Sequence, residues 1–395
     1  MATPIVRIAA KGDGVTQDGQ HFPGTVTGDI VEADGTVVPG PHRAVPPCRH
    51  FGRCGGCQLQ HVDEAAWRAF VTARVVDAAA GQGLTADNVL DTHCSPPATR
   101  RRATYHASVG KRAKIGFRER GGHTIIDQRE CLILLPALQA LVAPLRQLLT
   151  KFSDRNTVDI DLVMADQGIA CVLRKLALEG LDETQRLIDF AQDHRLARLT
   201  VDQGYGPEVQ WEPEPVTVTL GGVPVPLPDG AFLQPTADGE AAMLRDAREW
   251  LADSATVADL FAGLGTFAFA LSDQAKVLAV EASRDVSLAC RMAARSRARQ
   301  VQTAHRDLFR DPLTAAELAK LDAVVLDPPR AGAKTQCREL AQSAVERIVY
   351  VSCNPSSWAR DARTLVDGGY RLAALRPIGQ FRWSTHVELT SLFVR

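Results

Sequence analysis

The sequence contains no apolar run of about 18 residues, the length that a membrane-spanning helix needs, so we expect no contact with a membrane. Its first residues do not combine a basic stretch with an apolar one, so they do not predict a secretory signal. Internal repeats and long low-complexity tracts are also missing, so repeat architectures are not expected. The 395 residues are 45% hydrophobic and 23% charged, which is ordinary for a globular chain of two or three domains. We therefore expect a cytoplasmic, multidomain protein.

The net charge is only −1, but charge is distributed unevenly along the chain. Residues 100–131 contain nine Lys or Arg against three acidic residues, and residues 284–310 contain seven against two. Residues 154–253 contain eight against nineteen. A solvated face explains any one charge run, but two basic segments on an otherwise acidic chain favour contact with a polyanion. The pattern supports a nucleic acid partner.

Three regions of the chain differ in pattern. Residues 1–45 have short alternating runs separated by Asp-Gly turns, which predicts a small, strongly curved β-module. Residues 46–230 predict a central α+β region, in which a helix over residues 64–82 is a candidate for docking on the C-terminal domain. In residues 231–395, compact apolar runs alternate with helices. That pattern predicts an α/β, doubly wound, Rossmann-like domain with a ligand crevice at the carboxyl ends of its parallel strands.

A glycine-containing loop joins the first predicted strand of the C-terminal domain to a helix. It carries Gly263 and Gly265, and glycines allow a backbone to approach a ligand closely. Glu281 ends the next strand, where a carboxylate can accept hydrogen bonds from two ribose hydroxyls. The third glycine of a dinucleotide fingerprint is missing, which favours a nucleoside without a pyrophosphate. S-adenosylmethionine is the leading candidate, and a simple tight turn is the alternative interpretation of the loop.

Three further groups lie next to predicted strands of the same domain. Asp327 begins an Asp-Pro-Pro-Arg loop, which by itself is also compatible with a structural turn. Cys353 follows the next strand, and the Arg330 loop together with a helix starting near Ser356 predicts a lowered pKa for its thiol. Glu388 precedes the last apolar run, and a partly desolvated carboxylate there can act as a general base. Alone, these last two residues would be a buried thiol and an ordinary surface Glu.

Nine cysteines are present, and three of them lie within ten residues. Without an export signal, this spacing favours a metal site over a disulfide framework. The expected ligands are Cys48, Cys54, Cys57 and the remote Cys131. Four thiolates suit either zinc or an iron–sulfur cluster, and three clustered ligands with one distant ligand favour a [4Fe–4S] cluster over two zinc knuckles. The other four, Cys94, Cys171, Cys290 and Cys337, are interpreted as inert thiols.

Taken together, these segments resemble the bacterial RNA uridine-C5 methyltransferases, which make 5-methyluridine in 23S rRNA and tRNA. The matching motifs occur in family order over essentially the whole chain, about residues 5–395. They are Cys-Arg-His-Phe-Gly-Arg-Cys-Gly-Gly-Cys (48–57), Lys-Ile-Gly-Phe (114–117), Gly-Ala-Phe-Leu-Gln-Pro (230–235), Asp-Leu-Phe-Ala-Gly-Leu-Gly-Thr (259–266), Asp-Pro-Pro-Arg-Ala-Gly (327–332), Ser-Cys-Asn-Pro (352–355) and His-Val-Glu (386–388). The N-terminal module likewise resembles the family's small RNA-binding TRAM/OB-like β-barrel, in a short form.

The resemblance implies a role for each matching residue. Cys353 would add to C6 of the target uracil, which makes C5 nucleophilic enough to take a methyl group from S-adenosylmethionine, and Glu388 would then remove the C5 proton. Residues at cofactor-contacting positions are Gln234, Phe261, Thr266, Glu281, Asp307 and Asp327. The four cysteines named above match the ligands of a structural [4Fe–4S] cluster. A uracil in folded RNA would be flipped out before reaction.

Several functions remain open at this point. The four cysteines favour 23S rRNA as the substrate, because the bacterial tRNA members of the family generally lack them. A tRNA methyltransferase is the alternative, and a catalytically silent RNA-binding protein of the same fold is another. A methyltransferase for small molecules or proteins is disfavoured, because direct transfer to nitrogen or oxygen needs no cysteine adduct. A monomer is expected.

Overall fold

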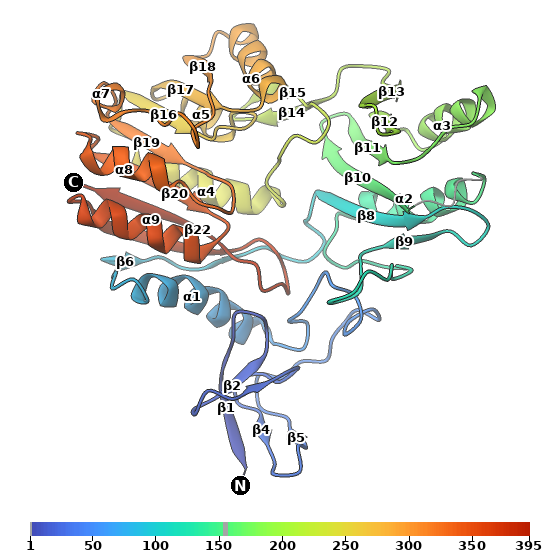
Figure 1. Ribbon diagram of the computed structural model, residues 1–395, viewed down its shortest axis with the longest axis horizontal. Coiled ribbons are helices and arrows are strands. Elements are labelled where there is room, and N and C mark those ends of the chain that lie inside the picture. Colours follow the sequence, from blue (N-terminus) through green and yellow to red (C-terminus); the bar gives the residue numbers. More distant parts are fainter. Residues whose placement is uncertain (1, 153–156) are drawn as a thin grey trace.

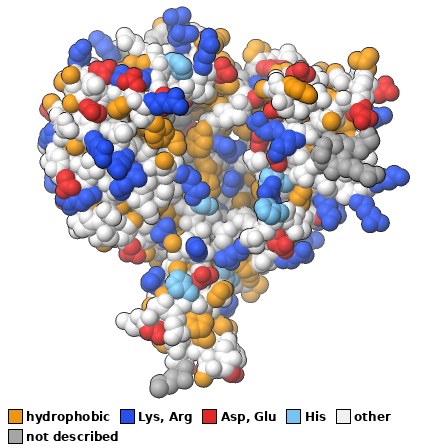
Figure 2. All heavy atoms as spheres, in the orientation of Figure 1, with side chains coloured by type: hydrophobic (Ala, Val, Ile, Leu, Met, Phe, Trp, Pro, Cys, Tyr) orange, Lys and Arg blue, Asp and Glu red, His pale blue; other side chains and the backbone are white. Residues whose placement is uncertain are grey.

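The computed structural model describes residues 2–152 and 157–395. Figure 1 shows three bodies: a small N-terminal sheet at the bottom, a central domain on the right and a larger C-terminal domain on the left. The sheet and helices of the central domain come from one continuous stretch, residues 102–211, whereas the sheet of the C-terminal domain also takes in strands from residues 88–94. This arrangement places the C-terminal and central domains on either side of a shared hollow, which Figure 2 shows in its centre.

The N-terminal body is an antiparallel sheet with the strand order β3-β2-β1-β4-β5. Its strands are β1 (Thr3–Ile8), β2 (Gly14–Thr16), β3 (His21–Phe22), β4 (Ile30–Val31) and β5 (Val37–Val38). Buried Asp29 holds the loops together, since it accepts hydrogen bonds from the Val26 and Gly40 amides and pairs with Arg43. Among the described strands, β3 and β5 do not pair with each other. The module is therefore an open sheet and not a closed barrel.

The central domain is a six-stranded sheet with the order β13-β12-β11-β10-β8-β9, packed against two helices. The strands are β8 (Arg102–Ser108), β9 (Lys114–Gly116), β10 (Thr157–Ala165), β11 (Gly168–Arg174), β12 (Arg198–Asp202) and β13 (Pro207–Trp211). The helices are α2 (Pro136–Leu149) and α3 (Leu181–Asp193). In α2, buried leucines recur at the three- and four-residue spacing of one helix face, as at Leu138, Leu141 and Leu145. That face covers the sheet and closes the domain's core.

The C-terminal domain is built on a nine-stranded sheet, whose main path is β18-β17-β16-β19-β20-β22-β21-β6. Its strands are β16 (Thr256–Leu260), β17 (Lys276–Glu281), β18 (Val301–His305), β19 (Ala323–Leu326), β20 (Arg347–Ser352), β21 (Arg371–Gly379) and β22 (Glu388–Val394). One face is covered by α4 (Ala237–Trp250), α5 (Thr266–Leu271), α6 (Arg284–Ser296) and the hairpin β14 (Thr217–Leu220)–β15 (Val223–Pro226). The other face carries α7 (Ala315–Leu318), α8 (Lys334–Gln342) and α9 (Pro355–Asp367). The domain is thus doubly wound.

Strand β22 is the exception to the parallel order. It runs antiparallel to both β20 and β21, whereas β16 to β20 are parallel to one another. The amino end of β22 therefore lies at the same edge of the sheet as the carboxyl ends of the parallel strands. That edge is where a doubly wound sheet places its ligands.

The segment that follows the N-terminal body packs on the C-terminal domain. Helix α1 (Glu64–Ala80) is capped by Asp63, and buried Trp67 and Val71 lie against β21 and α9. A Cβ built on Gly379 of β21 would lie 3.1 Å from the Trp67 ring, so a larger residue there would require the ring to shift by a few tenths of an ångström. The short strands β6 (Asn88–Val89) and β7 (His93–Cys94) then pair with β21. The structure thus divides residues 46–230 between two bodies.

In the part of the chain that the structure describes, no helix has both the length and the apolar character needed to cross a membrane.

Candidate active site

Cys353 and Glu388 lie opposite each other at the carboxyl edge of the large sheet. Ser352 of β20 pairs with Leu389 of β22, so Cys353 and Glu388 occupy the next position beyond this pair. Glu388 is only 4% exposed, and Cys353 is half-buried. The antiparallel register therefore joins a thiol and a carboxyl that are 35 positions apart in the sequence.

A chain of side-chain amides connects Glu388 to Asp327. Gln380 lies diagonally across from Glu388 in the sheet, and its Nε2 donates to Gln234 Oε1 at 3.1 Å. Gln234 Nε2 in turn donates to Asp327 Oδ2 at 3.2 Å. The sequence predicted Gln234, Asp327 and Glu388 as site residues, but it did not single out Gln380. The register of β21 against β22 provides the signal for it, because Ile378 pairs with Glu388 and Gln380 follows two residues later.

Burial governs the protonation of these carboxyls. Loss of hydration and the nearby Asp327 carboxyl together raise the pKa of Glu388 to about 8, against the opposing effects of Gln380 and Arg330. Burial likewise raises the pKa of Asp327 to about 7, although its hydrogen bond from Gln234 acts in the opposite direction. A third carboxyl at this edge, Asp259, has its pKa raised to about 8 by complete burial. The edge thus holds three carboxyls that resist ionisation.

The lowered thiol pKa predicted for Cys353 is wrong for this state of the protein. Burial, Glu388 and Asp327 together raise the pKa of Cys353 to about 11, and the Arg330 guanidinium only partly offsets them. The helix that follows does begin close to the expected position, at Pro355. The two carboxyl neighbours could not be recognised from the local sequence, since one comes from β22 and the other follows β19.

The loop of Asp327 is tied to the loop of Cys353. The Arg330 carbonyl accepts hydrogen bonds from Asn354 Nδ2 at 2.9 Å and from Ser357 Oγ at 3.0 Å. The Arg330 guanidinium lies 3.3 Å from His386 Nδ1, two residues before Glu388. These contacts hold the tips of β19, β20 and β22 in one fixed arrangement, which brings Arg330 close to the thiol.

The glycine loop has the geometry of a cradle for a small ligand. Gly265 adopts a left-handed conformation, and a Cβ there would lie 2.8 Å from the Phe269 ring, so no other residue fits before Thr266 begins α5. The Glu281 carboxylate accepts hydrogen bonds from the Gly263 amide at 3.0 Å and the Ser283 amide at 2.6 Å. The two amides fix this carboxylate at the tip of β17, close to the loop.

Two aromatic rings lie beside this cradle. Phe261 follows β16 in a strained left-handed conformation, and its ring centroid lies 5.4 Å from that of the exposed Phe309. Asp307 accepts a hydrogen bond from the Phe309 amide at 3.0 Å. Asp259, which the sequence interpretation did not assign, holds the first turn of α5 through the Ala268 amide, and its other oxygen has no partner among the described residues. All the sequence-predicted cofactor residues therefore follow strands of one sheet or belong to the adjoining Gln234 segment.

Part of the first basic segment has a structural role. Arg101 Nε donates to the Gln234 carbonyl at 2.8 Å, and its guanidinium pairs with Glu240. Arg102 donates to the Leu233 carbonyl at 3.0 Å. These arginines belong to the central domain and hold the segment that carries Gln234, so they are not simply a face for a polyanion. Figure 2 shows other Lys and Arg side chains around the hollow between the two domains.

The four cysteines that the sequence grouped together line one pocket between the N-terminal segment and the central domain. All four thiols are free. Burial raises the pKa of Cys57 and of Cys131, and neighbouring thiols of the group raise both further. Within residues 2–152 and 157–395, no group of three or more Cys, His, Asp or Glu side chains is arranged to hold a single metal ion. The thiols are gathered, but not around one ion.

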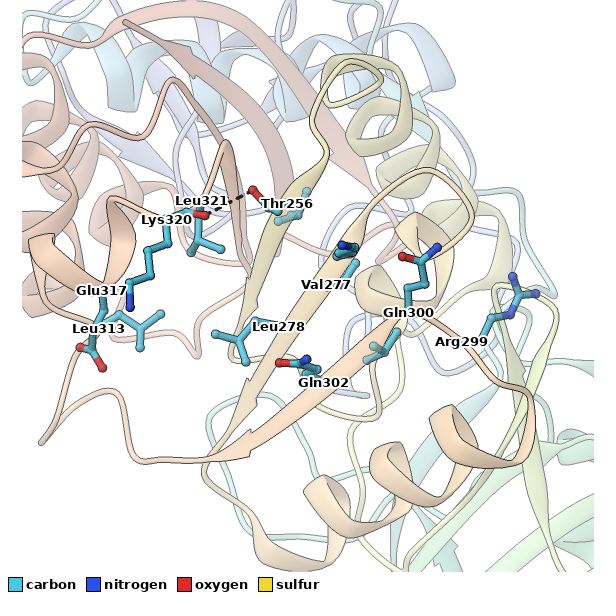
Figure 3. Close-up of a pocket in the computed structure, with 13 residues that line it drawn as sticks. Thr256, Val277, Leu278, Arg299, Gln300, Gln302, Leu313, Glu317, Lys320 and Leu321 are labelled. Carbon is cyan, nitrogen blue, oxygen red and sulfur yellow. Dashed lines mark hydrogen bonds between the residues drawn. The ribbon is translucent and has the colours of Figure 1, made fainter.

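A separate cavity of about 670 Å³ lies at the opposite edge of the sheet, by the amino ends of β16, β17 and β18 (Figure 3). Leu278, Leu313 and Leu321 line it together with Lys320. None of the residues predicted from the sequence as site residues lies among its described lining. The chemistry-bearing side chains are gathered at the carboxyl edge instead.

The raised pKa of Glu388 predicts a specific effect of pH on stability. The carboxyl is protonated in the folded protein up to about pH 8, but it ionises from about pH 4.5 in the unfolded chain. The free energy of unfolding should therefore fall as the pH rises between these values, by at most about 1.4 kcal/mol per pH unit for this group. In Glu388→Gln this contribution should disappear, which urea unfolding from pH 5 to pH 8.5 measures. Exposed Glu346→Gln is the control; parallel curves for wild type and Glu388→Gln would contradict the assignment.

Comparison with known proteins gives consistent results. The family model described as tRNA (Uracil-5-)-methyltransferase matches residues 225–395. An uncharacterized RNA methyltransferase of Zymomonas mobilis is 45% identical over 393 residues, which cover 99% of both chains. A 23S rRNA (uracil(1939)-C(5))-methyltransferase of Chromohalobacter salexigens is 36% identical over 90% of this chain and 77% of its own length.

A solved structure shares the whole fold. The tRNA (uracil-54, C5)-methyltransferase of Pyrococcus abyssi, in complex with S-adenosyl-L-homocysteine, superposes with a TM-score of 0.75 over 100% of both chains, at 20% identity. At that identity the similarity shows the fold alone, an α/β methyltransferase fold. The two sequence relatives show the family as well as the fold, since they are at least 36% identical over 90% or more of this chain. The chain is therefore a methyltransferase that belongs to the RNA uracil-C5 methyltransferase family.

Proposed function

We propose that this protein methylates C5 of a uridine in RNA, with S-adenosylmethionine as the methyl donor. The observation that supports this best is the placement of Cys353 and Glu388 side by side at one edge of the sheet, where the carboxyl end of β20 adjoins the amino end of β22. Uracil C5 is a poor nucleophile until C6 carries an added group, so the reaction needs a thiolate on one side and a base on the other. One strand pair supplies both groups.

The proposed reaction begins when the Cys353 thiolate forms a bond to C6, which makes C5 an enolate-like nucleophile. Arg330 is the cation that favours the thiolate form. S-adenosylmethionine would supply the methyl group that becomes bonded to C5, and the sulfur–methyl bond that breaks would leave its sulfur as the neutral thioether of S-adenosylhomocysteine. Glu388 then removes the C5 proton, the electron pair restores the C5–C6 double bond, and the C6–sulfur bond breaks. The thiolate that added is the thiolate expelled, so the net change exchanges one C5 proton for one methyl group.

The residues present fit the proposed cofactor. Glu281, fixed by two backbone amides, offers its carboxylate to a ribose, and the space kept open by Gly263 and Gly265 admits a ligand next to the backbone. Phe261, Thr266 and Asp307 follow at the same edge. Gln234 and Asp327 lie between this cradle and Glu388. These residues would hold the donor at the edge of the sheet that also carries Cys353.

Two variants test the assigned roles. Cys353→Ala should reduce methylation of rRNA to background while leaving S-adenosylmethionine affinity within about twofold, because the thiol does not belong to the cradle. Glu388→Gln should lower kcat by about 10²–10⁴-fold, as expected for loss of a general base, and should accumulate a protein–RNA adduct. Turnover is measured with labelled donor, the adduct on denaturing gels and donor affinity by calorimetry.

Buried Cys171→Ala, in the core of the central domain, is the matched control for loss of a thiol. It should retain wild-type kcat. Residual turnover by Cys353→Ala above background would reject the nucleophile, and an inactive Glu388→Gln protein without adduct would reject the base.

We propose 23S rRNA as the substrate, in preference to tRNA. The Chromohalobacter relative, whose name specifies 23S rRNA, is 36% identical, whereas the archaeal tRNA enzyme is 20% identical. A uracil within folded RNA must leave its stack to reach a half-buried thiol, and the hollow between the domains offers basic walls for the flanking backbone. The N-terminal sheet would extend that surface.

We also propose that Cys48, Cys54, Cys57 and Cys131 hold a [4Fe–4S] cluster of structural function. A tetrahedral zinc site with zinc–sulfur bonds of about 2.3 Å draws its four sulfurs around one point. The thiols of this pocket are not arranged around a single ion, but they line the same space, as suits a cluster in which each sulfur binds a different iron. Its residues link the N-terminal segment to the central domain and would hold the two together.

Metal analysis tests this proposal. Protein purified without oxygen should be brown and contain about four irons per chain, as four thiolates imply. Cys131→Ser should lose most of the iron and destabilise the central domain, whereas Cys171→Ser should retain the iron. Stoichiometric zinc in place of iron would contradict the cluster.

A further inference from the structure

Gln380 lies directly beyond β21 and is only 1% exposed. Ile378 pairs with Glu388 across the sheet, and side chains two residues apart on a strand share a face, so Gln380 is the diagonal neighbour of the carboxyl. The amide donates from Nε2 to Gln234 Oε1 at 3.1 Å, and its proximity favours the ionised form of Glu388. A buried amide in contact with the proposed base has a defined position in the site, yet none of the reaction steps above uses it.

The orientation of this amide is fixed from behind. Its Oε1 is buried without a hydrogen-bond partner among the described residues and lies against the first turn of α4, where a Cβ built on Gly239 would be 3.0 Å away. The amino end of a helix carries partial positive charge, which favours an oxygen there over an NH₂ group. Consequently the NH₂ group faces Gln234 and Glu388.

The partner of Gln380 is equally constrained. The side chain of Gln234 donates to Asp327, and its backbone carbonyl accepts a hydrogen bond from Arg101. Arg101 in turn forms an ion pair with Glu240 of α4 at 2.5 Å. Arg101 belongs to the central domain, and α4 supports Gln380 from the C-terminal domain. The two amides are therefore held from both domains at once.

We propose that Gln380 is a positioning residue for the general base: its amide, locked between α4 and Gln234, holds the Glu388 carboxylate in the orientation that removes the C5 proton. This inference rests on the proposed function and deepens it. The groups that act on Glu388 are Asp327, which opposes ionisation, and Arg330 and Gln380, which favour it. Cys353 is the fourth neighbour. Of the two groups that favour ionisation, Gln380 is uncharged and buried, so its contribution is a hydrogen bond of fixed direction.

The test compares Gln380→Met, which keeps the side-chain length and removes the amide, with Gln336→Met. Gln336 is also fully buried, but among the described residues its amide hydrogen-bonds only to the Leu313 backbone, on the other face of the domain. Both variants lose a buried amide and should be destabilised to a similar extent. Only Gln380→Met should lower kcat for rRNA methylation, by about 10- to 100-fold, with the KM values for RNA and donor within about threefold.

Two further readouts separate positioning from general damage. In Gln380→Met the midpoint of the kcat–pH profile should rise by about one unit, and protein–RNA adduct should accumulate during turnover, because proton removal becomes slow while cysteine addition continues. Gln336→Met should show neither change. If Gln380→Met retains the wild-type kcat and midpoint, or loses kcat without adduct, the proposal is overturned.

The outcome is distinguishable from failure of the proposed function. Wild-type protein that methylates no rRNA and forms no adduct would reject that function. The positioning role is then tested by urea unfolding of the same variants. The free energy of unfolding of wild type decreases with rising pH up to a limiting pH, and Gln380→Met should raise that limiting pH by about one unit. An unchanged limit would reject the role.

Discussion

The antiparallel pairing of β22 with β20 is the constraint on which the rest of the site depends. Parallel strands bring only their carboxyl ends to a crevice, so a site made from them alone collects residues that follow strands. Reversal of one strand adds residues that precede a strand, and here that residue is Glu388. The register between Ser352 and Leu389 then leaves the thiol of Cys353 and the carboxyl of Glu388 opposed. Every step that we propose for the reaction follows from this pair.

Three buried carboxyls determine the electrostatic properties of this edge of the sheet. Asp259, Asp327 and Glu388 all have raised pKa values, and Asp327 opposes the ionisation of both others. Such a site gains from a cation, because a positive ligand would relieve the repulsion and restore the charged forms. The proposed donor carries a positive sulfonium. Its binding would therefore prepare Glu388 to act as a base, while the high thiol pKa protects Cys353 from reaction in the absence of ligand.

Much of the C-terminal fold and of the candidate site could be predicted from the sequence, because apolar runs followed by polar residues indicate where strands end. The doubly wound C-terminal domain and the placement of Asp327 and Cys353 at one edge followed from that pattern. Glu388 precedes a strand, so its role came from the resemblance and its placement from the antiparallel register of β22. The pKa of Cys353 did not, because its charged neighbours come from two other strands and burial outweighs Arg330. Gln380 was missed for the same reason: its importance depends on cross-strand register. The arginines at 101 and 102 illustrate a further limit, since a basic segment can support a chain segment as readily as it can face RNA.

The central claim is that Cys353 forms a bond to C6 of a uridine and that proton removal at C5 releases it. Incubation of the protein with S-adenosylmethionine and 23S rRNA fragments that contain 5-fluorouridine tests it directly, since fluorine cannot leave C5 as a proton. The account predicts a covalent protein–RNA complex that survives denaturation, with the modified peptide containing Cys353. Binding of donor and RNA without any covalent complex, or a complex at another residue, would contradict it.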